Sequence, residues 1–378
     1  MNDAATQVHL REVTDDDIEG VATLHQEVGF TPPDAAHWRW LWGDNPAREL
    51  MAGDWPRGWV LERDGLLGGY IANLPLAYAL GERDLGVAVP RALITSEQFA
   101  SQGLRLVSQY LKQRGPDLLL CTTANSKASP IWDAFRAKRV PQPGLDAIMF
   151  WPLSADAFIA ASATKLGVPS VIARHMGTLG GPFLRAESAL RTRGIPRPTR
   201  SHTVTAIHPA DIDGEFDDLW DAKRRESVAL RASRSADILR WHFAGRPQAA
   251  KSSDRDIVVF KLLGRPGIQG YAVSETRHER KLELTRTRLV DLVVLGEDKE
   301  LITHLLWHVQ EHARAIGSHV LEASTLLPAS HEVALAGRPF SRSVAAWSYF
   351  YKCRGSLREE LKSAERWALT PFDGDTSL

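Results

Sequence analysis

Apolar positions along the chain follow two spacings that occur in the same order twice. A spacing of two, typical of strands, covers residues 8–13 and 202–207, and a spacing of three to four, typical of one helix face, covers residues 14–28 and 210–227. Acidic residues or a threonine open both helical stretches, as at many helix N-termini. The pattern therefore predicts a strand followed by a helix at the start of each half.

A tryptophan-containing segment follows this helix in each half. "HWRWLWGDNP" covers residues 37–46 and "ILRWHFAGRP" covers residues 238–247, and both contain an Arg-Trp pair with a proline seven positions after the arginine. Features common to both halves are more typical of architecture than of catalysis. We therefore interpret Trp40 and Trp241 as core anchors, each preceded by an arginine that we expect to pair with a nearby carboxylate.

Further segments align at the offset that separates these tryptophans (241 − 40 = 201). Residues 68–72, 89–95, 103–115 and 118–122 of the first half match residues 269–273, 290–296, 300–317 and 319–323 of the second. A helix that crosses over between two strands favours a parallel pair, whereas a hairpin, such as the one expected with Asp64 and Gly65 as its turn, makes an antiparallel one. The sequence therefore predicts an α+β fold of two tandem units, each a mixed twisted sheet flanked by helices.

The repeat also predicts the domain organisation. We expect a first unit at residues 1–150, a helical connector and linker at 151–200, a second unit at 201–355 and a C-terminal tail at 356–378. Residues 151–200 match neither unit, and they combine helical spacing with glycine and proline breaks.

Composition narrows the classes of protein that remain. The chain has 378 residues, of which 44% are apolar and 24% charged, as in globular proteins of more than one domain. Its 46 basic residues balance 46 acidic ones, so we expect no nucleic-acid partner. Two cysteines fit a reducing compartment, and the apolar runs are too short to form a membrane segment. We expect a cytoplasmic protein.

Two stretches of the first unit carry candidate chemistry. "ITSEQFASQGLRLV" (94–107) joins a predicted strand to the long helix and places Gly103 at the helix start, where backbone N–H groups suit a pyrophosphate. "TTANSKASPIWDAFRAKRVPQP" (122–143) carries Asn125 and Ser129 where the next strand ends and another helix begins.

Together with the order of the elements, these motifs resemble the GNAT superfamily of acyl-CoA-dependent N-acyltransferases. Two units in one chain are similar to its tandem members, such as mycothiol-synthase-like enzymes and GNAT-like proteins of bacterial exopolysaccharide gene clusters. The resemblance implies acetyl-CoA or another acyl-CoA as cosubstrate and no metal. It also implies a thioester carbonyl held by backbone N–H groups of the fourth strand. The implied cofactor-binding residues are Leu93, Ile94, Thr95, Gln102, Gly103, Leu104, Arg105, Asn125 and Ser129.

Three positions depart from the family pattern. Ala100 and Arg105 stand where the family has an Arg or Gln and a small residue, and Trp132 stands where many relatives have a tyrosine that protonates the leaving thiolate. A tryptophan has no proton to give at neutral pH. These departures favour an alternative function, in which a GNAT-fold protein has lost transfer chemistry and acts as a binding or scaffold protein of a biosynthetic pathway.

The second unit lacks the glycine motif. Glu297, Asp298 and Glu300 surround the start of its long helix, where they would repel a pyrophosphate but suit a helix N-terminus. We therefore expect only the first unit to bind coenzyme A.

Two carboxylates are candidates for the catalytic base. Glu97 follows the fourth strand of the first unit, and Asp291 stands alone in the apolar strand "RLVDLVVL" of the second. A buried carboxylate there has the surroundings that raise a pKa. Alternatively, Asp291 pairs with an arginine such as Arg240 or Arg288.

Four side chains are candidates for contact with the acceptor. His37, Trp38 and Trp42 occur in the tryptophan segment of the first unit only, and Tyr70 lies in the strand that follows. We predict that these residues form an aromatic wall facing the acceptor.

Three histidines share one face of the second long helix. His304, His308 and His312 are four residues apart, a spacing that can bring imidazoles to one metal ion. No cysteine or carboxylate pair converges on them in the sequence. We interpret them as a solvated helix face and predict no metal site.

The function predicted first is an acyl-CoA-dependent N-acyltransferase that acts on a small amine or amino sugar. The amine would attack the thioester directly, without a covalent enzyme intermediate. A third possibility is a FemAB-type transferase that uses aminoacyl-tRNA, but the balanced charge disfavours it because tRNA binding needs a basic face.

Overall fold

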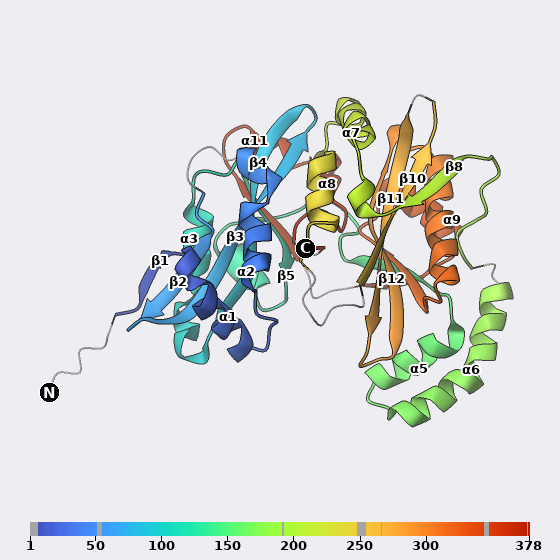
Figure 1. Ribbon diagram of the computed structural model, residues 1–378, viewed down its shortest axis with the longest axis horizontal. Helices are drawn as coiled ribbons and strands as arrows, with labels where there is room; N and C mark the ends of the chain where they lie inside the picture. Colours follow the sequence, from blue (N-terminus) through green and yellow to red (C-terminus); the bar gives the residue numbers. More distant parts are fainter. Residues whose placement is uncertain are drawn as a thin grey trace.

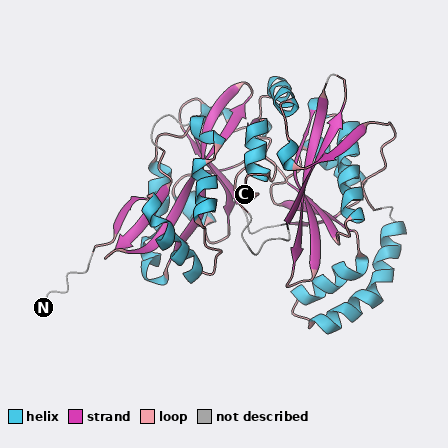
Figure 2. Cartoon of the chain, viewed as in Figure 1, coloured by secondary structure: helices cyan, strands magenta, loops and turns pink. Residues whose placement is uncertain are grey.

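The computed structural model describes residues 7–50, 55–190, 193–247, 255–265, 267–343, 348–375 and 377–378. They form two mixed sheets flanked by helices, which confirms the predicted α+β class (Figures 1 and 2). Within these residues, no helix has the length and apolar character needed to cross a membrane.

The first sheet has eight strands, and seven of them lie in the order β1-β2-β3-β4-β5-β15-β6 while β9 pairs with β3. Their bounds are β1 (His9–Glu12), β2 (Gly58–Arg63), β3 (Leu66–Leu80), β4 (Arg83–Thr95), β5 (Leu118–Ala124), β6 (Lys138–Arg139), β9 (Leu230–Ala232) and β15 (Ser348–Cys353). Only the β4–β5 pair in this sheet is parallel. The predicted hairpin between β2 and β3 is confirmed, and its turn residues Asp64 and Gly65 have φ angles of 53° and 75°.

The second sheet has seven strands in the order β14-β7-β13-β12-β11-β10-β8. Their bounds are β7 (Ala147–Pro152), β8 (Thr203–Ile207), β10 (Arg255–Leu263), β11 (Ile268–Glu279), β12 (Leu284–Val294), β13 (Val320–Ser324) and β14 (Phe340–Ser343). Here too only one pair, β12–β13, is parallel. Read from β8, this order matches that of the first sheet place by place.

The helices occupy equivalent places around the two sheets. The first half contains α1 (Ile18–Glu27), α2 (Ala35–Trp38), α3 (Gly103–Lys112) and α4 (Ser129–Ala134), and the second half contains α7 (Glu215–Glu226), α8 (Ala236–Phe243), α9 (Lys299–Ala315) and α10 (Pro328–Ala336). Between them, α5 (Ala155–Lys165) and α6 (Ser170–Leu190) form a helical pair beside the second sheet, and α11 (Leu357–Glu360) follows β15 (Figure 1).

The two sheets exchange the strands at their sixth places, and the first sheet also takes up β9 of the second half. In the chain β7 follows β6 of the first sheet, yet it pairs with β13 and β14 in the second. Reciprocally, β15 follows β14 of the second sheet but pairs with β5 and β6 in the first. The expected boundary at residue 150 therefore falls inside a strand that belongs to the second sheet.

One hydrophobic cluster joins the two halves and contains both predicted anchors, Trp40 and Trp241. Their rings stack with centroids 5.3 Å apart. Each indole N–H donates to the main-chain carbonyl of the other tryptophan at 2.8 Å. The two segments that the sequence aligns thus meet each other at the centre of the molecule.

Residues 368–375, 377 and 378, which the sequence presents as part of a tail, pack between the two sheets (Figure 1). Leu369, Phe372, Ser377 and Leu378 are all buried. The backbone N–H of Ala368 donates to the carbonyl of Leu230, next to the first sheet. We refer to residues 368–378 as the C-terminal segment.

Candidate functional site

The strands β4 and β5 separate after a short parallel contact. Their pairs are Val87 with Leu118 and Ala88 with Leu119, and both strands continue beyond these positions. Between Arg91 and Ile94, β4 carries a bulge opposite β3, because Ala72 pairs with Arg91 and Tyr70 pairs with Ile94. We call the opening between the diverging strands the β4–β5 wedge.

A non-glycine residue at an unusual backbone angle marks this bulge. Ala92 has φ 53°, in the left-handed region that disfavours a side chain. A bulge removes one residue from the ladder and re-aims its N–H and C=O groups. The predicted oxyanion residues Leu93, Ile94 and Thr95 follow directly, and the latter two pair with Tyr70 and Gly69 of β3.

The C-terminal segment enters the β4–β5 wedge with a carboxylate. The Asp375 side chain accepts hydrogen bonds from the hydroxyls of Thr122 (3.0 Å) and Thr123 (3.3 Å) on β5. Burial raises the pKa of Asp375, and the Arg91 charge and the threonine hydroxyls oppose this effect. The wedge therefore holds a carboxylate whose pKa is shifted toward the protonated form.

Arg91 links the same segment to β4. Its guanidinium donates to the main-chain oxygens of Asp375 (3.3 Å) and Leu378 (3.2 Å). Neither Asp375 nor Arg91 was among the site residues expected from the sequence. Asp375 lies outside every motif and repeated segment, and only the folded chain brings it to β5.

The predicted pyrophosphate loop forms a 3-10 helix, residues Glu97–Gln102, that runs directly into α3. The N–H of Gly103 donates to the carbonyl of Ala100 in this 3-10 turn. Leu104 is 53% exposed at the first turn of α3. Glu97, the predicted base on this side, lies exposed at the first residue of the 3-10 helix.

Arg105 lies over the start of α3. Its guanidinium donates to the main-chain carbonyl of Val8 (2.9 Å) and to the Gln102 side chain (3.1 Å). These contacts place a positive charge beside the helix N-terminus that the sequence predicts as the pyrophosphate site.

Asn125 caps the turn that leads from β5 into α4. Its side-chain oxygen accepts the backbone N–H groups of Lys127 (3.0 Å) and Ala128 (2.9 Å), and its carbonyl accepts the Ser129 hydroxyl (2.9 Å). Both predicted residues therefore have local bonds that shape the turn at the end of β5. Trp132, which follows on α4, is buried.

The four predicted acceptor residues have different surroundings. Trp38 and Trp42 are each 4% exposed, with ring centroids 4.5 Å apart in the central cluster. Tyr70 is buried beside the ring of His25, with centroids 5.9 Å apart. His37 is half-buried and contacts the Trp40 ring at 5.2 Å.

The charge state of His37 depends on arginines from both halves. Burial lowers the pKa of His37 to about 4, and the charges of Arg91 and Arg246 contribute to the shift. The Arg91 charge also lowers the pKa of His25. Arg91 alternates along β4 with Val87 and Val89, which lie in the cluster shared by the two halves, so it is on the face of β4 turned toward the second sheet.

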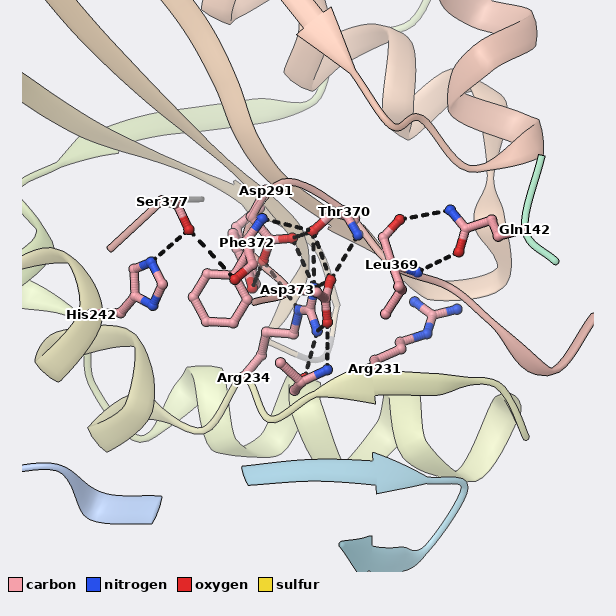
Figure 3. A network of polar contacts seen from close by, with 12 residues as sticks. Gln142, Arg231, Arg234, His242, Asp291, Leu369, Thr370, Phe372, Asp373 and Ser377 are labelled. Atoms are coloured by element: carbon pink, nitrogen blue, oxygen red, sulfur yellow. Dashed lines mark hydrogen bonds and ion pairs between the residues drawn. The ribbon is translucent and has the colours of Figure 1, made fainter. Parts of the chain in front are cut away.

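Asp291, the other predicted base, is saturated with hydrogen bonds (Figure 3). Arg234 donates to both of its oxygens (3.2 and 3.1 Å), Tyr271 donates to one (2.7 Å) and Thr370 to the other (2.8 Å). Arg234 also donates to Asp373 at 2.8 Å. Asp291 therefore anchors the C-terminal segment to the second sheet.

The ion pair proposed for Asp291 exists, but its partner differs from those expected. Arg240, one expected partner, donates to the carbonyl of Ile212 and pairs with Asp237 instead. Arg234 comes from the loop between β9 and α8 and reaches Asp291 on β12 of the same half. No pattern of residues around Arg234 in the sequence identifies it as the partner of Asp291.

The equivalent opening in the second sheet is closed. Between β12 and β13 a cavity of about 10 Å³ remains, and Thr370 and Pro371 of the C-terminal segment help to line it. Among the acidic residues at the start of α9, the Asp298 side chain accepts the N–H groups of Glu300 and Leu301, and Glu297 pairs with Lys223. Both have structural partners.

The predicted histidine face is partly buried. His304 is 3% exposed, and its ring lies 4.8 Å from that of His202. Neither His304 ring nitrogen has a hydrogen-bond partner among the described residues. Over the same residues, no group of three or more His, Cys, Asp or Glu side chains is arranged to hold a metal ion.

No protein-family model matches the sequence, and no curated protein sequence matches it. Solved structures do match. A GCN5-related N-acetyltransferase from Anabaena variabilis has a TM-score of 0.57 at 9% identity, over 92% of this chain and 73% of that one. One from Kribbella flavida has a TM-score of 0.56 at 11% identity, over 96% and 74%.

A third similar structure is the N-myristoyltransferase of Saccharomyces cerevisiae, solved with bound myristoyl-CoA. Its TM-score is 0.54 at 14% identity, over 92% of this chain and 79% of that one. Identities this low show a shared fold, and the resemblance expected from the sequence is confirmed at that level. The chain has the fold of the GCN5-related N-acetyltransferases.

Proposed function

We propose that the protein is an acyl-CoA-dependent N-acyltransferase whose reaction takes place in the β4–β5 wedge. The observation that carries the proposal is the coincidence of a strand bulge at Ala92 and a carboxylate, Asp375, in the same opening. The similarity of the fold to N-acetyltransferases and to an N-myristoyltransferase supports it. The expected cosubstrate is acetyl-CoA or another acyl-CoA.

The two features divide the chemistry between them. Backbone N–H groups at the bulge, near Ala92 and Leu93, are suited to stabilise the negative charge that develops on the thioester oxygen. Asp375 accepts a proton from the attacking ammonium group, and its raised pKa favours this role. The amine nitrogen then forms a bond to the carbonyl carbon, the carbon–sulfur bond breaks, the nitrogen loses its second proton to solvent, and the thiolate of coenzyme A takes up a proton from solvent.

The acceptor is a small amine that enters from the face of β4 turned toward the second sheet. His37 and Tyr70 of the predicted aromatic wall are associated with Arg91 on this face. Trp38 and Trp42 belong to the central cluster, so we assign them to the core. Glu97 is exposed on the 3-10 helix, and Asp291 is saturated, so we assign the base to neither.

We also infer that the chain is a tandem repeat of one unit. The matching strand orders and the reciprocal contact between Trp40 and Trp241 support this. The long helix of the first unit, α3, begins without a carboxylate cap, whereas Asp298 caps α9 of the second unit. The second unit then acts as a platform that holds Asp291 and, through it, the C-terminal segment.

A second candidate function is a GNAT-fold binding or scaffold protein without transfer activity. The observation that favours it is the start of α3, where the N–H of Gly103 is already bonded to Ala100 and the Arg105 side chain covers the turn. These contacts compete with a pyrophosphate for the same helix N-terminus.

Titration calorimetry with acetyl-CoA and coenzyme A separates the two functions. The wild type binds both ligands if the first function holds, and Gly103→Trp does not, since a side chain at residue 103 points toward Thr95 at the end of β4. Gly115→Trp is the matched control because Gly115 lies beyond the other end of α3 with open space around it. Absence of binding by the wild type contradicts the enzyme and supports the scaffold.

The role of Asp375 has a separate test. We expect Asp375→Asn to bind acyl-CoA like the wild type. In the presence of an amine acceptor it releases coenzyme A about 10²–10⁴-fold more slowly. Glu365→Gln, at an exposed carboxylate before the C-terminal segment, leaves the rate unchanged. A normal rate in Asp375→Asn contradicts the assignment of the base.

A further inference from the structure

We propose that the acceptor carries an anionic group, a phosphate or a carboxylate, which is bound by Arg91, Arg246 and Arg255 between the two halves. This inference rests on the proposed function, because it names the substrate class of the same wedge. We call the three arginines the interdomain arginine cluster.

Arg91 places one end of this cluster at the reaction centre. It is the residue before Ala92 of the β4 bulge, and its guanidinium donates to main-chain oxygens of Asp375 and Leu378. The carboxylate of Asp375 is bonded to the threonines of β5 instead. Arg91 therefore brings a positive charge to the wedge, and this charge is not paired directly with the Asp375 carboxylate.

Arg246 follows α8 and faces the same region from the second half. It lies over the Trp40 ring, 5.9 Å from the centroid. One of its terminal nitrogens, Nη1, is buried without a hydrogen-bond partner in the described part of the chain. A buried guanidinium nitrogen without a partner is costly, and a bound anion would satisfy it.

Arg255 opens β10 and completes the cluster. It pairs with Glu275 and donates to the main-chain oxygen of Ser377 at 3.2 Å. Glu275 is shared with a further arginine, Arg277, at 2.6 Å. One carboxylate thus serves two arginines on this side of the cluster.

The positive charges around Arg246 act on its protonation. Burial, together with the charges of Arg255, Arg91 and Arg277, lowers the pKa of Arg246 to about 9, and Glu275 has the opposite effect. The same cluster disfavours a charge on His242, which is buried and bonded to Ser377. Like charges held together in a partly buried interface are unfavourable unless an anion joins them.

The geometry also explains why the anion belongs to the acceptor. Arg91 is on the face of β4 that carries Val87 and Val89 and is turned toward the second sheet, whereas α3 packs with Ala88 on the other face. Guanidinium groups bind phosphate and carboxylate through paired N–H donors. An acceptor anchored there by its anion presents its amine to the thioester beside Ala92.

The test measures binding of three amine probes to the full chain in saturating coenzyme A: phosphoethanolamine, β-alanine and the uncharged-tail analogue ethanolamine. We expect at least one of the two anionic probes to bind about tenfold or more tightly than ethanolamine. One charge-assisted hydrogen bond between an arginine and the anion accounts for a difference in affinity of this size. Arg246→Gln abolishes this preference, and Arg246→Lys keeps part of it.

The matched control is Arg265→Gln, which removes an exposed arginine from the β10–β11 turn at the far end of β10. This variant keeps the preference. Equal binding of the three probes by the wild type, no binding of any probe, or an unchanged preference in Arg246→Gln overturns the proposal. Thermal unfolding of Arg246→Gln and Arg246→Lys shows whether both variants are folded. A preference lost in a folded Arg246→Gln protein is then due to the missing charge.

The outcomes separate this inference from the proposed function. Binding of coenzyme A is measured first in each titration, and its absence contradicts the acyltransferase. The probes are also titrated without coenzyme A, so a preference for the anionic probes is detected whether or not the cosubstrate binds.

Discussion

At the scale of single residues, Arg234 joins the second sheet to the C-terminal segment. It is 1% exposed, and it donates to the carboxylates of both Asp291 and Asp373, which are also buried (Figure 3). The pKa of Arg234 is raised because these two charges outweigh the effect of burial. A single guanidinium thus pairs with two buried carboxylates inside the molecule.

Replacing this arginine tests its structural role. Arg234→Met leaves Asp291 and Asp373 buried without their cation, and we expect the free energy of unfolding to fall by about 3–5 kcal/mol. Urea denaturation measures the change. Arg265→Gln, at an exposed arginine, is the control and changes stability by about 0.5 kcal/mol or less. A loss below about 1 kcal/mol in Arg234→Met would show that the ion pairs are not required for stability.

His37 predicts a dependence of stability on pH. Its folded-state pKa of about 4 lies below the ordinary value of 6.5, so between these values the unfolded chain binds a proton that the folded chain does not. The stability from the neutral ring is complete above pH 6.5 and is lost as the pH falls toward 4. His37→Gln lacks this contribution, so we expect its stability to fall less than that of the wild type.

Urea midpoints at pH 7, 5.5 and 4.5 check this difference. The comparison of the two proteins is needed because burial also lowers the pKa of His25 and His242, which remain in both. Parallel pH profiles for the wild type and His37→Gln would show that His37 titrates normally in the folded state.

At the scale of elements, the C-terminal segment depends on a glycine. Gly374 has φ +97°, and a Cβ on this residue would lie 2.2 Å from the Thr122 hydroxyl oxygen. Both the backbone angle and the space therefore exclude a side chain. This close approach is what brings the neighbouring Asp375 to β5.

We expect Gly374→Ala to displace the segment from the β4–β5 wedge and to cost about 1–3 kcal/mol of stability. Hydrogen exchange of the backbone amides at residues 372–375 becomes faster, because their protection depends on this packing. Gly115→Ala, at an exposed position with open space, is the control. Unchanged exchange in Gly374→Ala would mean that another contact holds the segment.

At the scale of the whole molecule, the exchange of β7 and β15 makes the two halves interdependent. Each sheet has a strand from the other half at its sixth place, and the central cluster takes residues from both. Because neither sheet is complete without the other half, we expect one cooperative unfolding transition rather than two.

Separate expression of residues 1–200 and 201–378 tests this interdependence. Residues 1–200 lack β9 and β15 of the first sheet, and residues 201–378 lack β7 of the second. Each fragment also exposes part of the shared core, so we expect neither to fold alone and both together to form a complex. Circular dichroism and size-exclusion chromatography of the single and co-expressed fragments distinguish these states. A fragment that is monomeric and unfolds cooperatively by itself would contradict the expectation.

Local patterns determined much of this fold. The spacing of apolar residues predicted the strand and helix order, and the Asp64–Gly65 turn predicted the β2–β3 hairpin, because these signals depend on neighbours in the chain. The offset between Trp40 and Trp241 identified both core anchors. The sequence alone therefore sufficed for the fold class and for the resemblance to GNAT proteins.

The tertiary structure alone decided which sheet β7 and β15 join, which arginine pairs with Asp291, and that Asp375 lies in the β4–β5 wedge. These contacts join residues that are far apart in the sequence, and no periodicity records them. A strand with a suitable apolar pattern fits either sheet, and a buried carboxylate accepts any arginine that reaches it. Packing of the two halves around one core selects among these possibilities, and the same packing forms the candidate site.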